Sequence, residues 1–390
     1  MKSVNISTPP QMNNKGLRFR YRPYRPGDEV RINELYYIVT GRRRSIEQFR
    51  WQWQDAPGGK GEIWLIELVR EDGSTKLIGH HGVMPIYFSF GERDLLAGKT
   101  ENTMVHPDFR NRILYPRFEK KFLSNYEKRF DLLFSTLGPP SAIRQRVSHG
   151  YEASKQWLHF EWILSYTAIL IRISSYLKRL ENRSLKSIGH VCYILSKSFN
   201  DWQRSNFASS NMNQQLKVLN SETAKKHPFF DRFWDKARHE YGLTPRRNKC
   251  DLQWKFWDNP YGGYTTVLFN DHKSSGYAII RNLNNSIYTL EDIVIYPLCS
   301  NSLIRFMQKI CNLVKTKGGV ALRFSTTNDN HPITKTLCRF PKKNLYDALT
   351  FLSRKHECTF MPRKFINPIL IKEHLHIKCY ITPFVFEGRI

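Results

Sequence analysis

The sequence contains one internal repeat, and this repeat limits the possible folds more than any other feature. The matched segments are 49–57 with 252–260, 101–107 with 291–297, and 134–136 with 324–326. The first pair aligns Trp51 with Trp254 at an offset of 203 residues, and the other two pairs share an offset of 190 residues. Three matches in one order predict two copies of a single structural unit.

Each copy alternates between strand-like and helix-like segments. In the first copy, an apolar residue recurs at helical spacing from Leu114 to Phe130. Runs rich in β-branched and aromatic residues, bounded by Gly, Asp or Pro, predict strands at 62–70, 76–88, 101–106, 131–137 and 157–171. This pattern predicts an α+β fold, with sheets flanked by helices.

The repeat also predicts the domain boundaries. We expect a flexible polar tail at 1–17, a first domain at 18–172 and a second, degenerate domain at 223–390. The connecting segment 173–222 begins as a basic amphipathic helix and ends in a stretch rich in Asn, Ser and Gln, which is typical of a linker.

Net charge and cysteine usage restrict the class of protein. Lys and Arg number 61 against 34 Asp and Glu, a net charge of +27, which calls for an anionic partner such as nucleic acid, an anionic membrane, an acidic protein or a phosphorylated cofactor. No apolar run is long enough to span a bilayer, and the N-terminus lacks the apolar core of a secretory signal. The seven cysteines form no C-x-x-C pair, which favours a reducing cytoplasm and no cysteine-bound metal.

The segment from Glu101 to Arg129 carries the clearest chemical signal. A predicted strand ends at Val105, a short basic turn follows, and a predicted helix begins after it. Helix N-termini present backbone N–H groups that lack partners, so they bind anions, and the turn arginines Arg110 and Arg112 add positive charge. The alternative interpretation is an exposed basic turn before a surface helix.

This segment resembles the phosphate-binding element of the GNAT superfamily of acyl-CoA-dependent N-acyltransferases. The resemblance rests on Val105-His-Pro107, the basic turn and the helix, with support from residues 24–28, 53–57, 72–79 and 150–151. It covers residues 18–170 well and the second copy in outline. The resemblance implies two tandem GNAT-like domains, each with a mixed, mostly antiparallel twisted sheet.

The resemblance also implies an activity: transfer of an acyl group from acetyl-CoA or another acyl-CoA to an amine acceptor, without a metal. It places Glu101 as the candidate base. It places the CoA-binding group at Val105, Arg110, Asn111, Arg112, Ile113, Leu114 and Tyr115, with the Val105 N–H polarising the thioester carbonyl.

This sequence departs from the family pattern at three positions. Ile113 and Tyr115 stand where the family has small residues in the phosphate loop, and Arg146 stands where it has a tyrosine acid. The second copy lacks the turn arginines, which predicts that it serves as a scaffold. These departures leave a second hypothesis open: a non-catalytic basic protein that binds nucleic acid, an anionic membrane or an acidic carrier protein. Nucleic acid is the less favoured partner, because the basic run Arg42–Arg44 has no interleaved aromatic residues.

Overall fold

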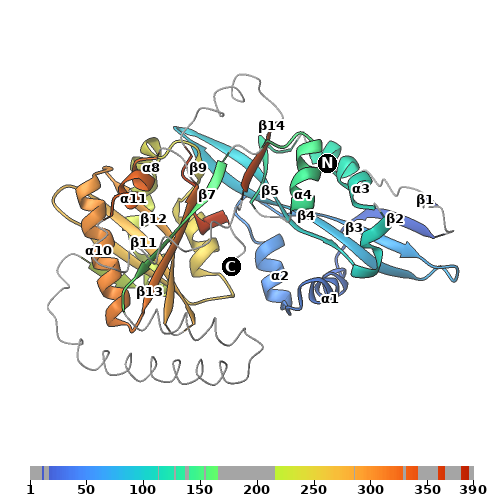
Figure 1. The fold of residues 1–390 in the computed structure, drawn as a ribbon, viewed down its shortest axis with the longest axis horizontal. Coiled ribbons are helices and arrows are strands. Elements are labelled where there is room, and N and C mark those ends of the chain that lie inside the picture. The colour runs from blue at the N-terminus through green and yellow to red at the C-terminus, as the bar shows by residue number, and fades with distance from the viewer. Residues whose placement is uncertain are drawn as a thin grey trace, which may run out of the picture.

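Two mixed sheets flanked by helices form the molecule, so the predicted α+β fold class is confirmed (Figure 1). The computed structural model describes residues 11–12, 17–112, 114–126, 129–136, 140–152, 155–165, 216–284, 286–327, 331–340, 359–364 and 379–385. Within these ranges, no helix is long and apolar enough to cross a membrane. The predicted linker helix at 173–202 lies outside the described residues.

The first half is built on five consecutive strands: β2 (Arg18–Pro23), β3 (Glu62–Val69), β4 (Thr75–Phe90), β5 (Arg93–Val105) and β6 (Leu132–Ser135). All neighbours are antiparallel except β5 and β6, which are parallel. Helices α1 (Glu29–Thr40) and α2 (Ile46–Trp53) lie against one face, and α3 (Leu114–Tyr126) and α4 (Pro140–Ser148) lie against the other (Figure 1).

The second half repeats this order of elements. Its sheet contains β8 (Leu216–Leu219), β10 (Tyr264–Asn270), β11 (Ser275–Asn284), β12 (Ile287–Tyr296) and β13 (Ala321–Thr327), again with one parallel pair, β12 and β13. The other elements are α7 (Ser221–Lys226), α8 (Phe229–Ala237), η2 (Arg238–Glu240), β9 (Thr244–Pro245), α9 (Lys249–Leu252), the π-helical turn η3 (Gln253–Trp257), α10 (Ser300–Thr316), α11 (Pro332–Cys338), β14 (Thr359–Lys364) and η4 (Pro383–Val385).

Two predicted boundaries need correction. Gln11 and Met12, inside the predicted tail, form β1 and pair with β2. Strand β8, inside the predicted linker, pairs with β10 and extends the second sheet. Both segments are short, so their sequences carry little periodicity, and their strand form depends on the neighbour that each one pairs with.

Local sequence signals set the ends of α1 and α2. Gly41 adopts φ 70° and ends α1, because a left-handed residue at this position is least strained as glycine. Ser45 then begins α2 with a capping box. Its hydroxyl accepts from the Gln48 amide at 3.1 Å, and the Gln48 side chain accepts from the Ser45 amide at 3.0 Å.

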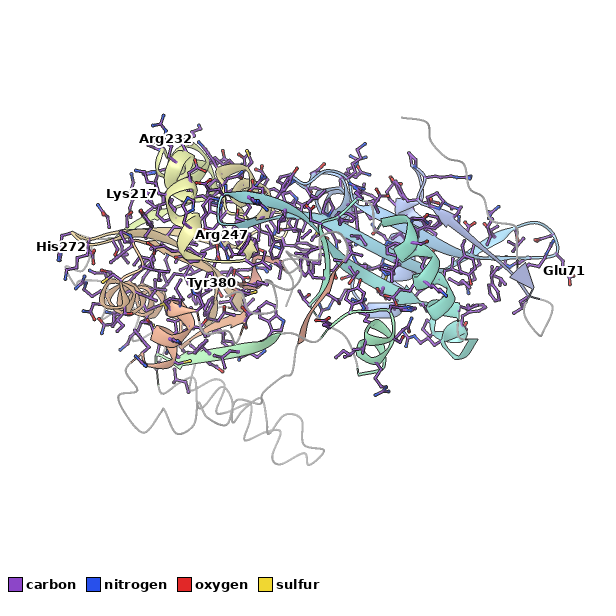
Figure 2. All side chains as sticks on the ribbon, turned by 90° about the horizontal axis from the view of Figure 1, so that it is seen from above. Glu71, Lys217, Arg232, Arg247, His272 and Tyr380 are labelled. Carbon is purple, nitrogen blue, oxygen red and sulfur yellow. The ribbon has the colours of Figure 1, made fainter. Side chains whose placement is uncertain are left out.

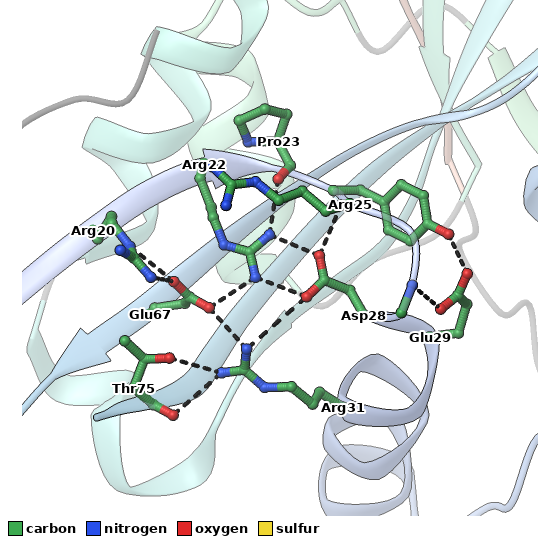
Figure 3. Close-up of polar contacts among 11 residues, drawn as sticks. Arg20, Arg22, Pro23, Arg25, Asp28, Glu29, Arg31, Glu67 and Thr75 are labelled. Carbon is green, nitrogen blue, oxygen red and sulfur yellow. Dashed lines mark hydrogen bonds and ion pairs between the residues drawn. The ribbon is translucent and has the colours of Figure 1, made fainter. Parts of the chain in front are cut away.

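A buried ion network ties the start of α1 to the sheet (Figure 3). Arg22 on β2 makes bidentate bonds to Asp28, both at 2.7 Å, and donates to Glu67 on β3 at 2.8 Å. Arg20 and Arg31 also donate to Glu67, whose side chain is fully buried. Burial alone raises the pKa of Glu67, but the hydrogen bonds and charges of Arg22 and Arg20 outweigh it and hold the pKa at about 2.

The two halves exchange their last strands. Strand β7 (Lys155–Ile163), from the first half, pairs along seven positions with β13 of the second sheet. Strand β14, from the second half, pairs with β6 of the first sheet through Met361–Lys364. The predicted first domain, 18–172, therefore includes a strand whose main ladder lies in the other sheet.

The β4–β5 hairpin is longer than its counterpart β11–β12 and reaches the second half (Figure 1). Near its tip, Phe88 and Ser89 of β4 pair with Pro245 and Thr244 of β9. The hairpin tip of the first copy thus forms an ordered contact between the halves.

Trp51 and Trp254, the aligned tryptophans of the repeat, meet where the halves join. Their rings stack with centroids 5.3 Å apart. The Trp51 indole N–H donates to the Trp254 carbonyl at 2.7 Å, and the Trp254 indole N–H donates to the Trp51 carbonyl at 2.9 Å. Each tryptophan thus makes the same contact to the other, as two-fold related residues do.

Candidate active site

The candidate site begins where β5 and β6 diverge. Their parallel pairing joins residues 97–99 to residues 132–134, but β5 continues to Val105. A β-bulge lies just beyond this pairing: the register between β4 and β5 shifts, and Asn102 adopts φ 48°. The ladder between the two strands therefore ends before the last residues of β5, and the region beside those residues is called the opening below.

The backbone amide of Val105 faces this opening. Val105 lies opposite Gly79 of β4, and the next amide, His106 N, donates to the Ile78 carbonyl of β4 at 2.8 Å. Because successive amides of a strand point to opposite sides, the N–H of Val105 points away from β4. This is the orientation that a carbonyl-polarising amide needs.

The predicted phosphate-binding residues follow directly. The 3₁₀ helix η1 (Pro107–Arg112) leads to α3, which begins at Leu114. Arg110 is exposed, and its Nε donates to the Val105 carbonyl at 3.3 Å. Leu114 is buried among Ile78 and Phe118, so only its backbone is available to a ligand.

The remaining predicted positions are described in part. Asn111 and Arg112 end η1, and Tyr115 lies in the first turn of α3, which brings their backbones to the end of β5. Ile113 lies outside the described residues.

Glu101 lies at the bulge, four residues before Val105. Its carboxylate forms an ion pair with Lys99, whose side chain is buried, and accepts from the Asn102 amide at 3.3 Å. The Glu101 side chain is 17% exposed. The structure thus places Glu101 beside the opening but engages one of its oxygens with a lysine.

Arg146 lies inside the opening. It comes from α4 and is 6% exposed. One guanidinium nitrogen donates to the Thr103 hydroxyl of β5 at 3.1 Å, and the other bonds the hydroxyls of Thr100 on β5 and Ser135 on β6. The Arg146 side chain therefore joins the two diverging strands.

A buried carboxylate supports Arg146 from behind. Glu119 on α3 is fully buried and accepts from Gln145 at 3.0 Å. Its oxygens lie 3.9 Å from His81, 4.0 Å from Arg146 and 3.8 Å from His149. Burial works to raise the pKa of Glu119, but its contacts to these three side chains outweigh burial and hold the pKa below the ordinary value.

Sequence reasoning missed Glu119, although a signal was present. The predicted helix 114–130 has an apolar face that includes Phe118 and Phe122, and Glu119 adjoins that face. A carboxylate at such a position must find buried cations or donors, which marks it as part of a polar cluster.

No protein-family model and no curated protein matches this sequence. Solved structures do. A probable N-acyltransferase from Enterococcus faecalis is similar with a TM-score of 0.54 and 10% identity, over 90% of this chain and 73% of that one. A GCN5-related N-acetyltransferase from Anabaena variabilis is similar with a TM-score of 0.51 and 13% identity, over 90% of this chain and 73% of that one. A GCN5-related N-acetyltransferase from Kribbella flavida is similar with a TM-score of 0.50 and 10% identity, over 90% of this chain and 72% of that one.

The fold is that of the GNAT superfamily. This confirms the fold that the resemblance implied. At such low identity, the similarity establishes the architecture and leaves the activity to be argued from the residues.

In the second GNAT-like sheet, a side chain bonds the strand amide that corresponds to the amide of Val105. Ile295 of β12 corresponds to Val105 at the repeat offset of 190 residues. Its N–H donates to the Tyr241 hydroxyl at 2.7 Å, and that hydroxyl donates back to the Ile295 carbonyl at 2.8 Å. Tyr380 bonds the Ile293 carbonyl at 2.7 Å, so two buried tyrosines cover this strand.

The basic turn of the first copy also has a closed counterpart. In the turn before α10, the Leu298 amide donates to the Glu240 carboxylate at 2.6 Å. Arg247, fully buried, pairs with Asp292 at 2.9 Å and lies inside the second lobe near Tyr380 (Figure 2). The protein's own side chains thus bond the strand amide of Ile295 and the turn amide of Leu298.

The histidine pair His80 and His81 lies on opposite faces of β4, as predicted. The His80 ring packs against Trp53 and the His81 ring stacks on Phe122, with centroids 5.6 and 3.9 Å apart. Burial lowers the pKa of His80 to about 3 and also lowers that of His81, so both are neutral at pH 7. In the part of the chain that the structure describes, no three His, Cys, Asp or Glu residues are arranged to hold a metal; His374 and His376 lie outside it.

Proposed function

We propose that the protein is an acyl-CoA-dependent N-acyltransferase whose reaction takes place in the first copy. One observation carries the proposal: the amide of Val105 faces an opening, whereas the corresponding amide of Ile295 is bonded to a tyrosine. Of two sites with one architecture, only the first keeps the polarising donor directed into a gap between strands.

The residues of the first copy fit the parts of an acyl-CoA. The Val105 N–H fits the thioester carbonyl, because a fixed donor stabilises charge that develops on that oxygen. The amides at the start of α3 fit the phosphates, together with Arg110, Asn111, Arg112, Ile113, Leu114 and Tyr115 as the predicted phosphate-binding group. Acetyl-CoA is the simplest acyl donor, and an amine is the acceptor.

Glu101 remains the predicted base, acting directly or through an ordered water. Its position at the bulge, four residues before Val105, supports the role. The second copy is proposed to be a scaffold. The cytoplasmic location, which the cysteine pattern favoured, also stays a prediction.

Thermal unfolding with acetyl-CoA tests the proposal. We expect acetyl-CoA to raise the melting temperature, because a ligand that binds only the folded state stabilises it. The double variant R110A/R112A should abolish the rise. R42A/R43A, which removes two exposed arginines from the α1–α2 connection, is the control for charge loss and should retain it.

The same experiment separates the second candidate function. Arg146 joins β5 and β6 across the opening, which favours a closed, non-catalytic site. If no acyl-CoA changes the melting temperature and DNA or RNA binds with steep salt dependence, the protein is a basic binding protein on a GNAT fold and the enzyme proposal is wrong.

A further inference from the structure

Arg146 holds a buried positive charge at the opening between β5 and β6. Its terminal nitrogens face strand hydroxyls, those of Thr100, Thr103 and Ser135, which are neutral. Its Nε faces the other way, toward the Glu119 carboxylate 4.0 Å behind it. The terminal nitrogens of the guanidinium therefore face β5 and β6, and the Glu119 carboxylate of α3 lies on the opposite side.

Arg146 is also close to the proposed reacting carbonyl. Thr103, which it bonds, lies two residues before Val105 on β5, and a two-residue step along a strand is about 7 Å. The other charged or titratable groups around Arg146 are His81 from β4, Glu119 from α3, His149 and Tyr151 after α4, and the Lys99–Glu101 pair on β5.

The chemistry of acyl transfer gives this charge a role. When the amine nitrogen bonds to the acyl carbon, the carbon–sulfur bond breaks and its electron pair stays on sulfur, while the proton of the amine passes to the base or to water. The sulfur then leaves either as a thiol, if an acid protonates it, or as a thiolate. A guanidinium cannot be that acid, because it keeps its proton far above neutral pH.

We propose that Arg146 stabilises the leaving sulfur of CoA as a thiolate, and so replaces a proton donor by a fixed positive charge. This inference rests on the proposed function. It explains why an arginine can stand where the fold family places a tyrosine acid. A nearby positive charge favours the charged form of an acid, so the sulfur of CoA leaves more readily as the thiolate.

The ionisation of bound CoA measures this effect without turnover. An alkyl thiol ionises near about pH 8.5. We expect the thiol of CoA bound to the wild-type protein to ionise about 1 to 3 pH units lower, by analogy with acids next to an arginine. The far-ultraviolet absorbance of the thiolate reports the titration. The same titration with desulfo-CoA, which lacks the sulfur, subtracts the ionisation of tyrosines.

Variants of α4 isolate the arginine. R146Q should return the bound thiol to about pH 8.5, and R146K, which keeps a charge, should lower it in part. R144Q removes an exposed arginine of the same helix and should behave as the wild type. R146Q leaves the buried Glu119 without the charge of Arg146, which destabilises the fold. The double variant E119Q/R146Q removes both charges together and avoids this cost.

The outcomes distinguish the role of Arg146 from the acyltransferase proposal. If CoA binds the wild type and its thiol ionises near about pH 8.5, or if the CoA thiol titrates alike in E119Q/R146Q and E119Q, the role of Arg146 is overturned and the acyltransferase proposal stands. If CoA does not bind the wild type at all, the acyltransferase proposal is overturned and this inference with it.

Discussion

At the scale of single residues, the first half places its buried carboxylates beside basic side chains. Glu67 and Glu119 are both fully buried, and each lies within 4.0 Å of two or more basic side chains. The Glu67 network anchors α1 to the sheet, and the Glu119 cluster supports Arg146. One network is structural, and we propose that the other serves the reaction.

The Glu67 network predicts a specific acid sensitivity. The pKa of Glu67 lies at about 2, below its ordinary 4.5, so its stabilisation is complete above pH 4.5 and is lost as the pH falls toward 2. E67Q should cost about 3 to 5 kcal/mol at pH 7, because it leaves the buried Arg22 with one charged partner fewer. It should also flatten the decline of stability below pH 4.5.

Urea unfolding of the wild type and E67Q between pH 7 and pH 2.5 checks both expectations. E71Q is the control, since Glu71 lies at the exposed tip of the β3–β4 hairpin (Figure 2). An acid decline equally steep in wild type and E67Q would contradict the prediction.

At this scale, part of the candidate site was visible in the sequence. Val105 and Arg110 follow from the strand–turn–helix pattern, and Arg146 stood out as a departure from the family. What Arg146 does was not visible, because its partners Thr100, Thr103 and Ser135 lie on two strands whose divergence is a tertiary feature. The closure of the second copy depends on Tyr241 and Tyr380, which lie far from β12 in the sequence.

At the scale of helices and strands, sequence periodicity identified most elements but not their partners. The predicted helix from Leu114 is α3, and the strand predicted at 62–70 is β3. Alternation shows that a segment is a strand and which residues share a face, but it does not say which sheet the strand joins. The exchange of β7 and β14 was therefore not predictable from residue patterns.

The tip of the β4–β5 hairpin depends on Asp94. This carboxylate bonds Arg238 and Arg246 of the second half, and these charges lower its pKa although burial opposes them. We expect D94N to cost about 1 kcal/mol or less, since the pair is partly exposed. The larger expected effect is local: faster amide hydrogen exchange in β9 and in the hairpin tip.

Hydrogen-exchange mass spectrometry of D94N against E92Q is the measurement. Glu92 lies in the same turn and is exposed, so E92Q removes one negative charge without removing a contact between the halves. Equal exchange in the two variants would show that Asp94 does not hold the tip in place.

At the scale of the whole molecule, the two halves complete each other. The core around Trp51 also contains Leu243, Trp254 and Ile381 from the second half. Each sheet includes one strand from the other half. The net charge of +27 is spread over this joined molecule, and one CoA would neutralise only a small part of it.

Cutting the chain tests this interdependence. If the halves 1–190 and 191–390 are expressed separately, each lacks a strand and exposes an unpaired sheet edge, so we expect aggregation or unfolding. Expressed together, they should form a stable heterodimer. Gel filtration and thermal unfolding distinguish these results, and two separate halves that each unfold cooperatively would disprove the dependence.

The reciprocal contact of Trp51 and Trp254 has a consequence for the origin of the protein. A reciprocal contact, in which each residue bonds its partner in the same way, is typical of two identical subunits related by a two-fold axis. Joined with the mutual exchange of β7 and β14, it gives this single chain the interface of a strand-swapped homodimer. This arrangement is what the duplication and fusion of a one-copy, strand-swapping ancestor would produce.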